Sequence, residues 1–405
     1  MLNIQSIRKD FPILSSKMSG RPLVYLDNAA TSQKPKSVID SVNSFYSTIN
    51  SNIHRGVFSI SEKATEAYES SRSEVARFLN APSCKEVIFT KGVTESINLV
   101  ASCFADQILK EGDEVLITHM EHHANIVPWQ LACKKTGAVL KVVEVLEDGT
   151  LDMNSYRNLI SNNTKLVSVV HVSNSLGTIN PVNEIINIAH SRNIPVLVDG
   201  AQSTTHLPID VQLMDCDFFV FSGHKLLGPT GVGVLYGKES WLSKFSPYQS
   251  GGDMIEKVSF EGTSFKDIPG KFEAGTPNIA GVIGLSEAIK YMSRININDI
   301  IEYEKTMIDY ANDRLRNIPG LKIIGDSNEK TSIFSFVFDG IHAHDIGTFL
   351  NADGIAIRTG HHCTMPLLER YEIAATARAS FSFYNTIEEV DVLSNSLQKM
   401  IKVFL

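Results

Sequence analysis

The distribution of hydrophobic and polar positions predicts an α/β architecture. Short apolar runs alternate with segments of helical apolar spacing between about residues 86 and 236. Such runs are typical of strands buried in a parallel sheet, and the spacing is typical of helices that cover both of its faces. The expected strands are residues 86–90, 114–118, 139–145, 166–172, 196–198 and 218–221, with 231–236 as an antiparallel neighbour, and the expected helices include 94–109, 129–135 and 183–192.

From about residue 300 the pattern predicts a smaller α+β domain with an antiparallel sheet. A charged helix is followed by expected strands at 322–324, 332–338, 355–358 and 377–383, with helices near 344–350 and over 387–404. Alternation along 377–383 places Ala377, Ala379, Phe381 and Phe383 on one face of the strand and Arg378 on the other. We expect an N-terminal segment (1–20) that packs with this small domain, a large domain (21–290) and the small C-terminal domain (291–405).

The net charge and the lack of long apolar stretches limit which partners the protein is expected to have. The 405 residues carry a formal net charge of −8, which argues against nucleic acid or an anionic membrane surface as the main partner. No apolar stretch reaches the roughly 18 residues of a membrane span, and the N-terminus lacks the apolar core of a signal peptide. We therefore expect a cytoplasmic protein without membrane contact. The five cysteines include no CxxC pair, so neither a disulfide framework nor a zinc ribbon is supported.

A lysine follows the apolar run 218–221, in the segment Ser222-Gly223-His224-Lys225. Open α/β sheets bind ligands at the carboxyl ends of their strands, so this side chain is expected at the mouth of the sheet. Burial there lowers the pKa of a lysine and makes its amine a nucleophile, which suggests a Schiff base with pyridoxal phosphate (PLP). By itself the segment fits a plain surface lysine equally well.

An acid at the end of the preceding strand favours the cofactor. Asp199 ends the run 196–198, and an aspartate in this place can pair with the ring nitrogen of PLP, while Gln202 can reach the ring oxygen. The alternative for Asp199 is an N-cap of the next helix. Thr94, behind Gly92, is expected to cap a helix whose N-terminus can bind phosphate, although an ordinary capped helix explains that segment by itself better.

A cysteine stands in a glycine-containing loop, Arg358-Thr359-Gly360-His361-His362-Cys363. The glycine predicts mobility, and the nearby arginine and histidines stabilise a thiolate, so Cys363 is expected to be a nucleophile. Cys103, Cys133 and Cys216 are expected to be inert packing residues. The stretch His119 to His123 matches no zinc-hydrolase motif, so we expect no metal and prefer an imidazole stacked on the PLP ring.

Six segments together resemble class V aminotransferase-fold enzymes, in order and over nearly the whole chain. They are residues 25–30, 121–125, 198–202, 222–225, 272–277 and 358–363. The last segment narrows the resemblance to the cysteine desulfurase and selenocysteine lyase branch, and the set is most similar to the group II desulfurases of SUF type. The resemblance implies the PLP-dependent transferase fold of type I, with a mostly parallel sheet of about seven strands.

The resemblance also implies a role for individual residues. Lys225 would anchor the cofactor and move protons, and Cys363 would take the sulfur. At the cofactor ring, His122 would stack on the ring, Asp199 would bind its nitrogen and Gln202 its hydroxyl. The phosphate would be held by Thr94, Ser222 and His224, and by Thr276 from the other subunit of a homodimer. The substrate would be bound by Arg378, Asn174 and Arg358. His54 and Arg55 match a family segment near the substrate.

The implied activity converts L-cysteine to L-alanine and an enzyme persulfide for iron–sulfur cluster assembly, with a SufE- or SufU-type protein as sulfur acceptor. The alternatives are a selenocysteine lyase, a PLP-binding protein without turnover, and a zinc hydrolase built on His122, His123 and Cys363. Two departures from the family stand out. Thr364 follows the cysteine where alanine is usual, and residues 268–272 lack the usual Trp-Arg of the dimer-contact hairpin.

Overall fold

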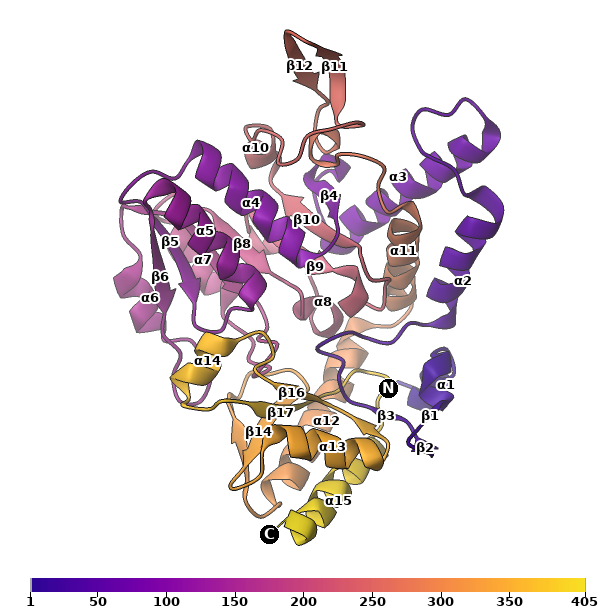
Figure 1. Cartoon of the computed structure of the whole chain (residues 1–405), viewed down its shortest axis with the longest axis vertical. Helices are drawn as coiled ribbons and strands as arrows, with labels where there is room; N and C mark the ends of the chain where they lie inside the picture. The colour runs from indigo at the N-terminus through magenta and orange to yellow at the C-terminus, as the bar shows by residue number, and fades with distance from the viewer. Residues whose placement is uncertain (1, 405) are drawn as a thin grey trace.

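The computed structural model describes residues 2–404 and divides into two regions (Figure 1). A large sheet flanked by helices forms the upper region, and a smaller sheet with its own helices forms the lower region, which carries the C-terminus. Within the described residues, none of the helices combines the length and the hydropathy that a membrane span requires.

The large sheet has seven strands and is mostly parallel, as the sequence predicts. Its order is β4 (Val87–Thr90), β10 (Gly233–Gly237), β9 (Phe218–Ser222), β8 (Val196–Asp199), β7 (Thr164–Val170), β5 (Glu114–Thr118) and β6 (Val139–Val143). Only β10 runs antiparallel to its two neighbours. Strand β7 ends two residues earlier than expected, because Val172 turns into a bridge with Ile179, and Asn174 therefore lies beyond the sheet edge.

Helices cover both faces of this sheet, which confirms the expected layers. Alternate residues of each strand point into two separate cores: Leu197, for example, packs with α4 and α5, whereas Val196 and Val198 pack with α7 and α11. The helices of this region are α2 (Lys36–Ser44), α3 (Ser59–Leu79), α4 (Val93–Gln107), α5 (Val127–Thr136), α6 (Met153–Leu159), α7 (Val182–His190), α8 (Ser203–His206), α9 (Val211–Met214), α10 (Glu239–Leu242) and α11 (Ile279–Ser293).

The smaller region is an antiparallel four-stranded sheet with helices. The strand order is β13 (Leu321–Ile324), β14 (Ile333–Phe338), β17 (Thr376–Ser380) and β16 (Arg358–Gly360), and the helices are α12 (Ile297–Arg316), α13 (Ala343–Ala352), α14 (Met365–Arg370) and α15 (Ile387–Phe404). The α+β character that the sequence predicts is therefore confirmed.

Two strand predictions in this region are wrong in detail. The expected strand 355–358 is two strands, because β15 (Ile355–Ala356) pairs with β3 (Val24–Tyr25) before the chain crosses to β17 as β16. Strand β17 ends at Ser380, so Phe383 joins a different core from Phe381 instead of continuing one face. Both faces of β17 are buried, which the simple alternation of apolar and polar residues does not show.

The N-terminal segment contacts both regions. It contains α1 (Ile4–Arg8) and the short strand β1 (Lys17–Met18), which pairs with β2 (Arg21–Pro22) just after the segment. Arg8 forms an ion pair of 2.9 Å with Glu389 of α15, and the Phe11 ring lies 5.8 Å from Tyr291 of α11. A hairpin of β11 (Ile255–Ser259) and β12 (Gly262–Phe265) projects from the upper end of the molecule (Figure 1). The domain boundaries given above stay predictions.

We predict that Gly233→Ala destabilises the large sheet. A Cβ added at Gly233 would lie 2.4 Å from the Gly92 Cα, so β10 must move away from the turn that precedes α4. Such overpacking costs about 1–3 kcal/mol of unfolding free energy, measurable by urea denaturation. Gly262→Ala is the matched control, because a Cβ there meets no atom within 4 Å. Equal unfolding free energies for the two variants would contradict the close packing.

Candidate active site

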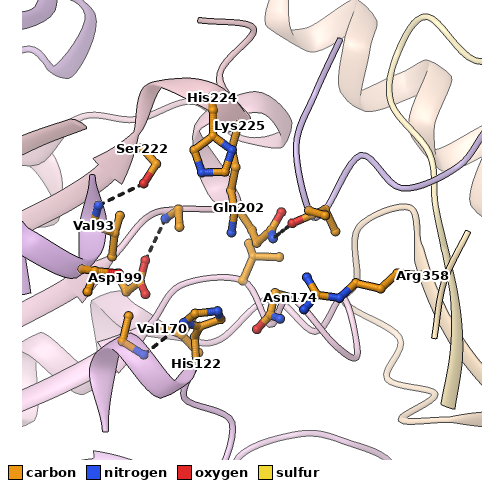
Figure 2. Close-up of a pocket in the computed structure, with 16 residues that line it drawn as sticks. Val93, His122, Val170, Asn174, Asp199, Gln202, Ser222, His224, Lys225 and Arg358 are labelled. Atoms are coloured by element: carbon orange, nitrogen blue, oxygen red, sulfur yellow. Dashed lines mark hydrogen bonds between the residues drawn. The ribbon is translucent and has the colours of Figure 1, made fainter. Parts of the chain in front are cut away.

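A cavity of about 160 Å³ opens at the carboxyl ends of β7, β8 and β9 (Figure 2). The last residues of these strands, Val170, Asp199 and Ser222, all line it. The other lining residues are Ala29, Ala30, Val93, Thr94, His122, Ala124, Val172, Asn174, Ala201, Gln202, His224, Lys225 and Arg358. The structure thus brings together nine of the twelve residues to which the sequence assigned a site role.

Lys225 lies in the cavity, in a 3-10 turn over Gly223–Lys225 that follows β9 directly. The turn is closed by a hydrogen bond from the Leu226 amide to the Gly223 carbonyl, and the Gly223 amide in turn donates to Val232. Burial lowers the pKa of Lys225 to about 8, and the positive charge of Arg378 acts in the same direction. Asp199 opposes this shift. The fall in pKa that the sequence predicts is therefore present.

Asp199 ends β8, which is the parallel neighbour of β9. Its carboxylate is buried and accepts a hydrogen bond of 2.9 Å from the Ala201 amide. Burial raises the pKa of Asp199, while that amide and the charge of Lys225 lower it. The N-cap of the following α8 is Gln202, so the helix-cap alternative for Asp199 is wrong. The Gln202 side chain donates to the Ala29 carbonyl at 2.7 Å.

The start of α4 meets the end of β9 at one edge of the cavity. The Val93 amide donates to Ser222 Oγ at 2.9 Å. Gly92, at φ 156°, is the N-cap of α4, and Thr94 is the second helical residue, so the prediction that Thr94 caps the helix is wrong. Gly92 takes this place because its φ of 156° lies in a region that favours glycine, while a Cβ there would meet only Ser222 Oγ, at 3.3 Å. Thr94 still faces the same space as Ser222 and His224.

Two imidazoles lie on opposite sides of the cavity in Figure 2. His122 Nδ1 accepts from the Ala124 amide at 3.0 Å, and burial together with Lys225 lowers the pKa of His122 to about 3. His224 has its pKa lowered to about 4, again by burial and then by Lys225. Both rings are therefore neutral at neutral pH, so His122 can lie against a flat ligand without adding charge to it.

Glu121 is a buried acid that the sequence reasoning did not single out. Its carboxylate accepts hydrogen bonds from the hydroxyl of Thr118, the amide side chain of Asn125 and the backbone of Val170. Burial raises the pKa of Glu121 to about 8. These contacts hold the turn that carries His122 against the end of β7. An acid next to paired histidines was the only signal in the sequence.

Cys363 lies on the loop between β16 and α14, next to the cavity. Arg358 Nη2, from β16, is 3.5 Å from its sulfur. The Cys363 carbonyl accepts from the His123 amide, and the His362 carbonyl accepts from Asn174, both at 2.8 Å. His362 and Cys363 hold positive φ values of 51° and 60°, a conformation that costs energy for residues other than glycine. The expected mobility of this loop stays a prediction, and these contacts oppose it.

Of the two histidines expected beside the Cys363 thiol, only His361 lies there. His361 Nδ1 accepts from the Cys363 amide at 3.1 Å, whereas the His362 ring is buried and bonds to Thr376 of β17. His123 joins His361 and Cys363 in one group of ligand atoms, all within 4.8 Å of one another. His122 is not in this group, so the zinc site postulated from His122, His123 and Cys363 is not assembled in that form.

Arg378 is fully buried beneath the cavity, at 0% exposure. Its guanidinium donates to the Asn174 carbonyl at 2.8 Å and to Asp27 at 2.9 Å. Burial lowers the pKa of Arg378, and Asp27 opposes that shift. Asn174 Oδ1 is buried without a hydrogen-bond partner, as is Arg378 Nε. Asp27 was present in the sequence resemblance but had no role assigned to it.

Three sequence-selected residues lie away from the cavity. Thr276 is exposed and lines a neighbouring cavity with Gly275 and Tyr248. His54 Nε2 is hydrogen-bonded to Glu69 at 3.0 Å in a further cavity lined by charged residues, and Arg55 lies beside that cavity. The expected reach of Thr276 into a second subunit stays a prediction.

Three of the other four cysteines fit the expected packing role. Cys103, Cys133 and Cys216 are buried, and burial raises the pKa of each thiol, to about 12 for Cys103. Because the thiolate is the reactive form, these three thiols are inert at neutral pH.

The sequence profile of the aminotransferase class-V family matches residues 24–393, and the chain belongs to this family. A protein of Synechococcus elongatus named cysteine desulfurase is 50% identical over 98% of the chain, and a probable cysteine desulfurase of Halalkalibacterium halodurans is 48% identical over all of it. The chain spans 64% of the first relative's length and 99% of the second's.

Solved structures share the whole fold. The crystal structure of the cysteine desulfurase CsdA from Escherichia coli matches with a TM-score of 0.93 and 40% identity, covering 100% of each chain. PLP is the cofactor carried by structures of this family. The fold expectation and the resemblance to the class V aminotransferase family are both confirmed.

We predict that the Lys225 amine becomes reactive at unusually low pH. A lysine reacts as the neutral amine, so with a pKa of about 8 the labelling rate of Lys225 in the cofactor-free chain rises with pH and is half-maximal near pH 8. An ordinary lysine in a reference peptide labels with a midpoint near 10.4. Competitive acylation followed by mass spectrometry measures both midpoints. Asp199→Asn removes the opposing charge and lowers the midpoint further, and equal midpoints for Lys225 and the peptide would refute the burial argument.

We also predict that Thr364 stabilises the cysteine loop. Its hydroxyl is buried, lies 2.6 Å from Ser175 Oγ and donates to the His361 carbonyl at 3.0 Å. Thr364→Ala removes these contacts, which are worth about 1 kcal/mol, so loop opening becomes about fivefold more frequent. Hydrogen exchange of the amides of 361–365 measures this change. Thr364→Ser keeps the hydroxyl and should exchange nearly as slowly as the native chain; equal exchange in the alanine variant would contradict the role.

Proposed function

We propose that the chain is a PLP-dependent cysteine desulfurase that converts L-cysteine to L-alanine and leaves the sulfur on Cys363 as a persulfide. The observation that carries the proposal is the meeting of two groups at one cavity. Lys225 and Asp199 come from the large sheet. The loop that follows β16 of the small sheet carries Cys363, whose sulfur lies 3.5 Å from Arg358 at the cavity wall. The relatives named above support the same activity.

The residues of the cavity fit PLP. Asp199 is a buried acid that can hold a protonated ring nitrogen, and Lys225 is an amine made nucleophilic by burial. The Gly92 turn and the first amides of α4, together with Ser222 and His224, suit a phosphate group. When bound, PLP withdraws the electrons left on the substrate carbon as its proton departs.

The chain's own residues account for the remaining steps. Arg378 and Arg358 supply the positive charge that orients the substrate carboxylate, helped by Asn174, which lines the cavity with Arg358 and contacts Arg378. Lys225 Nζ, with its pKa near 8, accepts the proton of the substrate α-carbon and can return one to the product. The Cys363 sulfur then bonds to the substrate sulfur, the carbon–sulfur bond breaks, and alanine forms with one persulfide.

The finer features are part of the same proposal. We assign the chain to the SUF type, which supplies sulfur for iron–sulfur cluster assembly, with L-cysteine as substrate and a SufE- or SufU-type acceptor. We further propose a cytoplasmic homodimer in which Thr276 reaches the partner's phosphate site. The exposure of Thr276 and that of the apolar residues Val57 (96%) and Phe58 (55%) support an interface. Light scattering measures the molar mass and so tests the homodimer. The rate of persulfide transfer to purified SufE- and SufU-type proteins tests which of them is the acceptor.

The central test is product analysis with L-cysteine and two site variants. Lys225→Ala is expected to lose at least about 10²-fold in alanine formation, since it removes both the anchor and the proton-transfer group. Cys363→Ser keeps the cofactor absorbance but is expected to form neither persulfide nor alanine. Cys84→Ser, which changes an exposed thiol elsewhere, is the matched control and should retain native rates. Native alanine formation by Cys363→Ser would reject the proposal.

A further inference from the structure

Three side chains that commonly ligate metals meet beside the cavity, where the proposed reaction assigns a role to only one of them. They are His123, His361 and Cys363, whose ligand atoms all lie within 4.8 Å of one another. The two imidazole rings are 5.5 Å apart between centroids. His361 is exposed, and the other two residues are partly exposed, so a solvated ion has access to all three.

The donor set and its spacing suit a thiophilic divalent cation. Zinc binds imidazole nitrogen at about 2.0–2.1 Å and thiolate at about 2.3 Å, so the donors of a tetrahedral site lie roughly 3.3–3.7 Å apart. The three atoms lie within 4.8 Å of one another, so they need to approach by at most about 1.5 Å, which side-chain rotation provides. One thiolate with two imidazoles leaves a fourth position for water.

Backbone hydrogen bonds already fix the ring nitrogens. The Met365 amide donates to His123 Nε2, and the Cys363 amide donates to His361 Nδ1, both at 3.1 Å. An amide donates only to an unprotonated nitrogen, so each ring directs a lone pair toward the turn at Cys363. A cation would replace two neutral hydrogen bonds, each with a net worth of about 1 kcal/mol. It would also replace the Arg358 contact to the sulfur.

The backbone around these ligands is held in place. The His123 amide donates to the Cys363 carbonyl, and Asn174 donates to the neighbouring His362 carbonyl, both at 2.8 Å. His123 and the cysteine loop come from distant parts of the sequence, and the first of these bonds ties them directly together. The ligands therefore need little ordering when an ion binds, which favours affinity.

We propose that His123, His361 and Cys363 form a binding site for Zn²⁺ or Cd²⁺ that reversibly blocks the thiol. The ion takes the lone pairs of both imidazoles and of the sulfur, and the thiol proton passes to solvent. The bound ion draws electron density from the sulfur, which lowers its nucleophilicity, and it occupies space beside the sulfur that a substrate would approach. Inhibition of sulfur transfer rests on the proposed function, whereas binding of the ion does not.

The test titrates the chelator-treated holoenzyme with Cd²⁺ and follows the ultraviolet absorbance of the cadmium–thiolate bond. We expect saturation at one ion per chain, with Zn²⁺ as a competitor and with protection of Cys363 from alkylation. Cys363→Ser should abolish the signal, and His123→Gln and His361→Gln should each weaken affinity by at least about tenfold. Cys84→Ser is the matched control, because Cys84 is an exposed thiol outside this group, and it should bind Cd²⁺ as the native chain does.

Unchanged affinity in both histidine variants would overturn the proposal, since it would show binding by the thiol alone. Loss of the signal in Cys84→Ser would overturn it as well. Circular dichroism and the cofactor absorbance of each variant establish that the fold is retained. Binding by a protein that forms no alanine from L-cysteine would leave the metal site standing and refute the desulfurase instead.

Discussion

The site depends on a constraint of parallel sheets: the carboxyl ends of neighbouring strands meet at one edge. Strands β8 and β9 are such neighbours, so Asp199 at the end of one and Lys225 just beyond the other share a cavity. Burial at this edge favours the neutral amine of Lys225, and Asp199 limits that effect. An acid and a nucleophilic amine thus come together because of strand order, although 26 positions separate them in the sequence.

The second sheet supplies the thiol, and its placement depends on contacts between the regions. Asn174, just beyond β7, donates to the cysteine loop and accepts from Arg378 of β17 through its carbonyl. Arg378 in turn is paired with Asp27 from the N-terminal part of the chain. Three distant segments therefore hold the loop that carries Cys363. A change in any of them would move the thiol relative to Lys225 without touching either residue.

Much of this arrangement was predictable from the sequence, for physical reasons. The seven strands and the last helix, α15, follow from apolar runs and helical spacing, and the adjacency of Asp199 and Lys225 follows from the α/β alternation. The resemblance to a family added roles for His122 and Arg378. Sequence patterns predict a feature correctly where a single helix or strand determines it.

The sequence predictions are wrong where contacts between distant segments determine the structure. Gly92, whose backbone lies against Gly233 of β10, replaces Thr94 as the helix cap, and the strand expected over 355–358 divides because its two halves pair with different partners. His123, rather than His362, joins the thiol because the His362 ring turns into the core toward Thr376. No local periodicity encodes these pairings.

The most direct test of the central claim is the stoichiometry of the first turnover in the absence of any reductant or acceptor. The account predicts a burst of one alanine per active site, with an equal amount of Cys363 carrying one additional sulfur atom by mass spectrometry. Continued alanine formation without sulfur on Cys363, or sulfur found first on another cysteine, would contradict the assignment of Lys225 and Cys363 to one reaction.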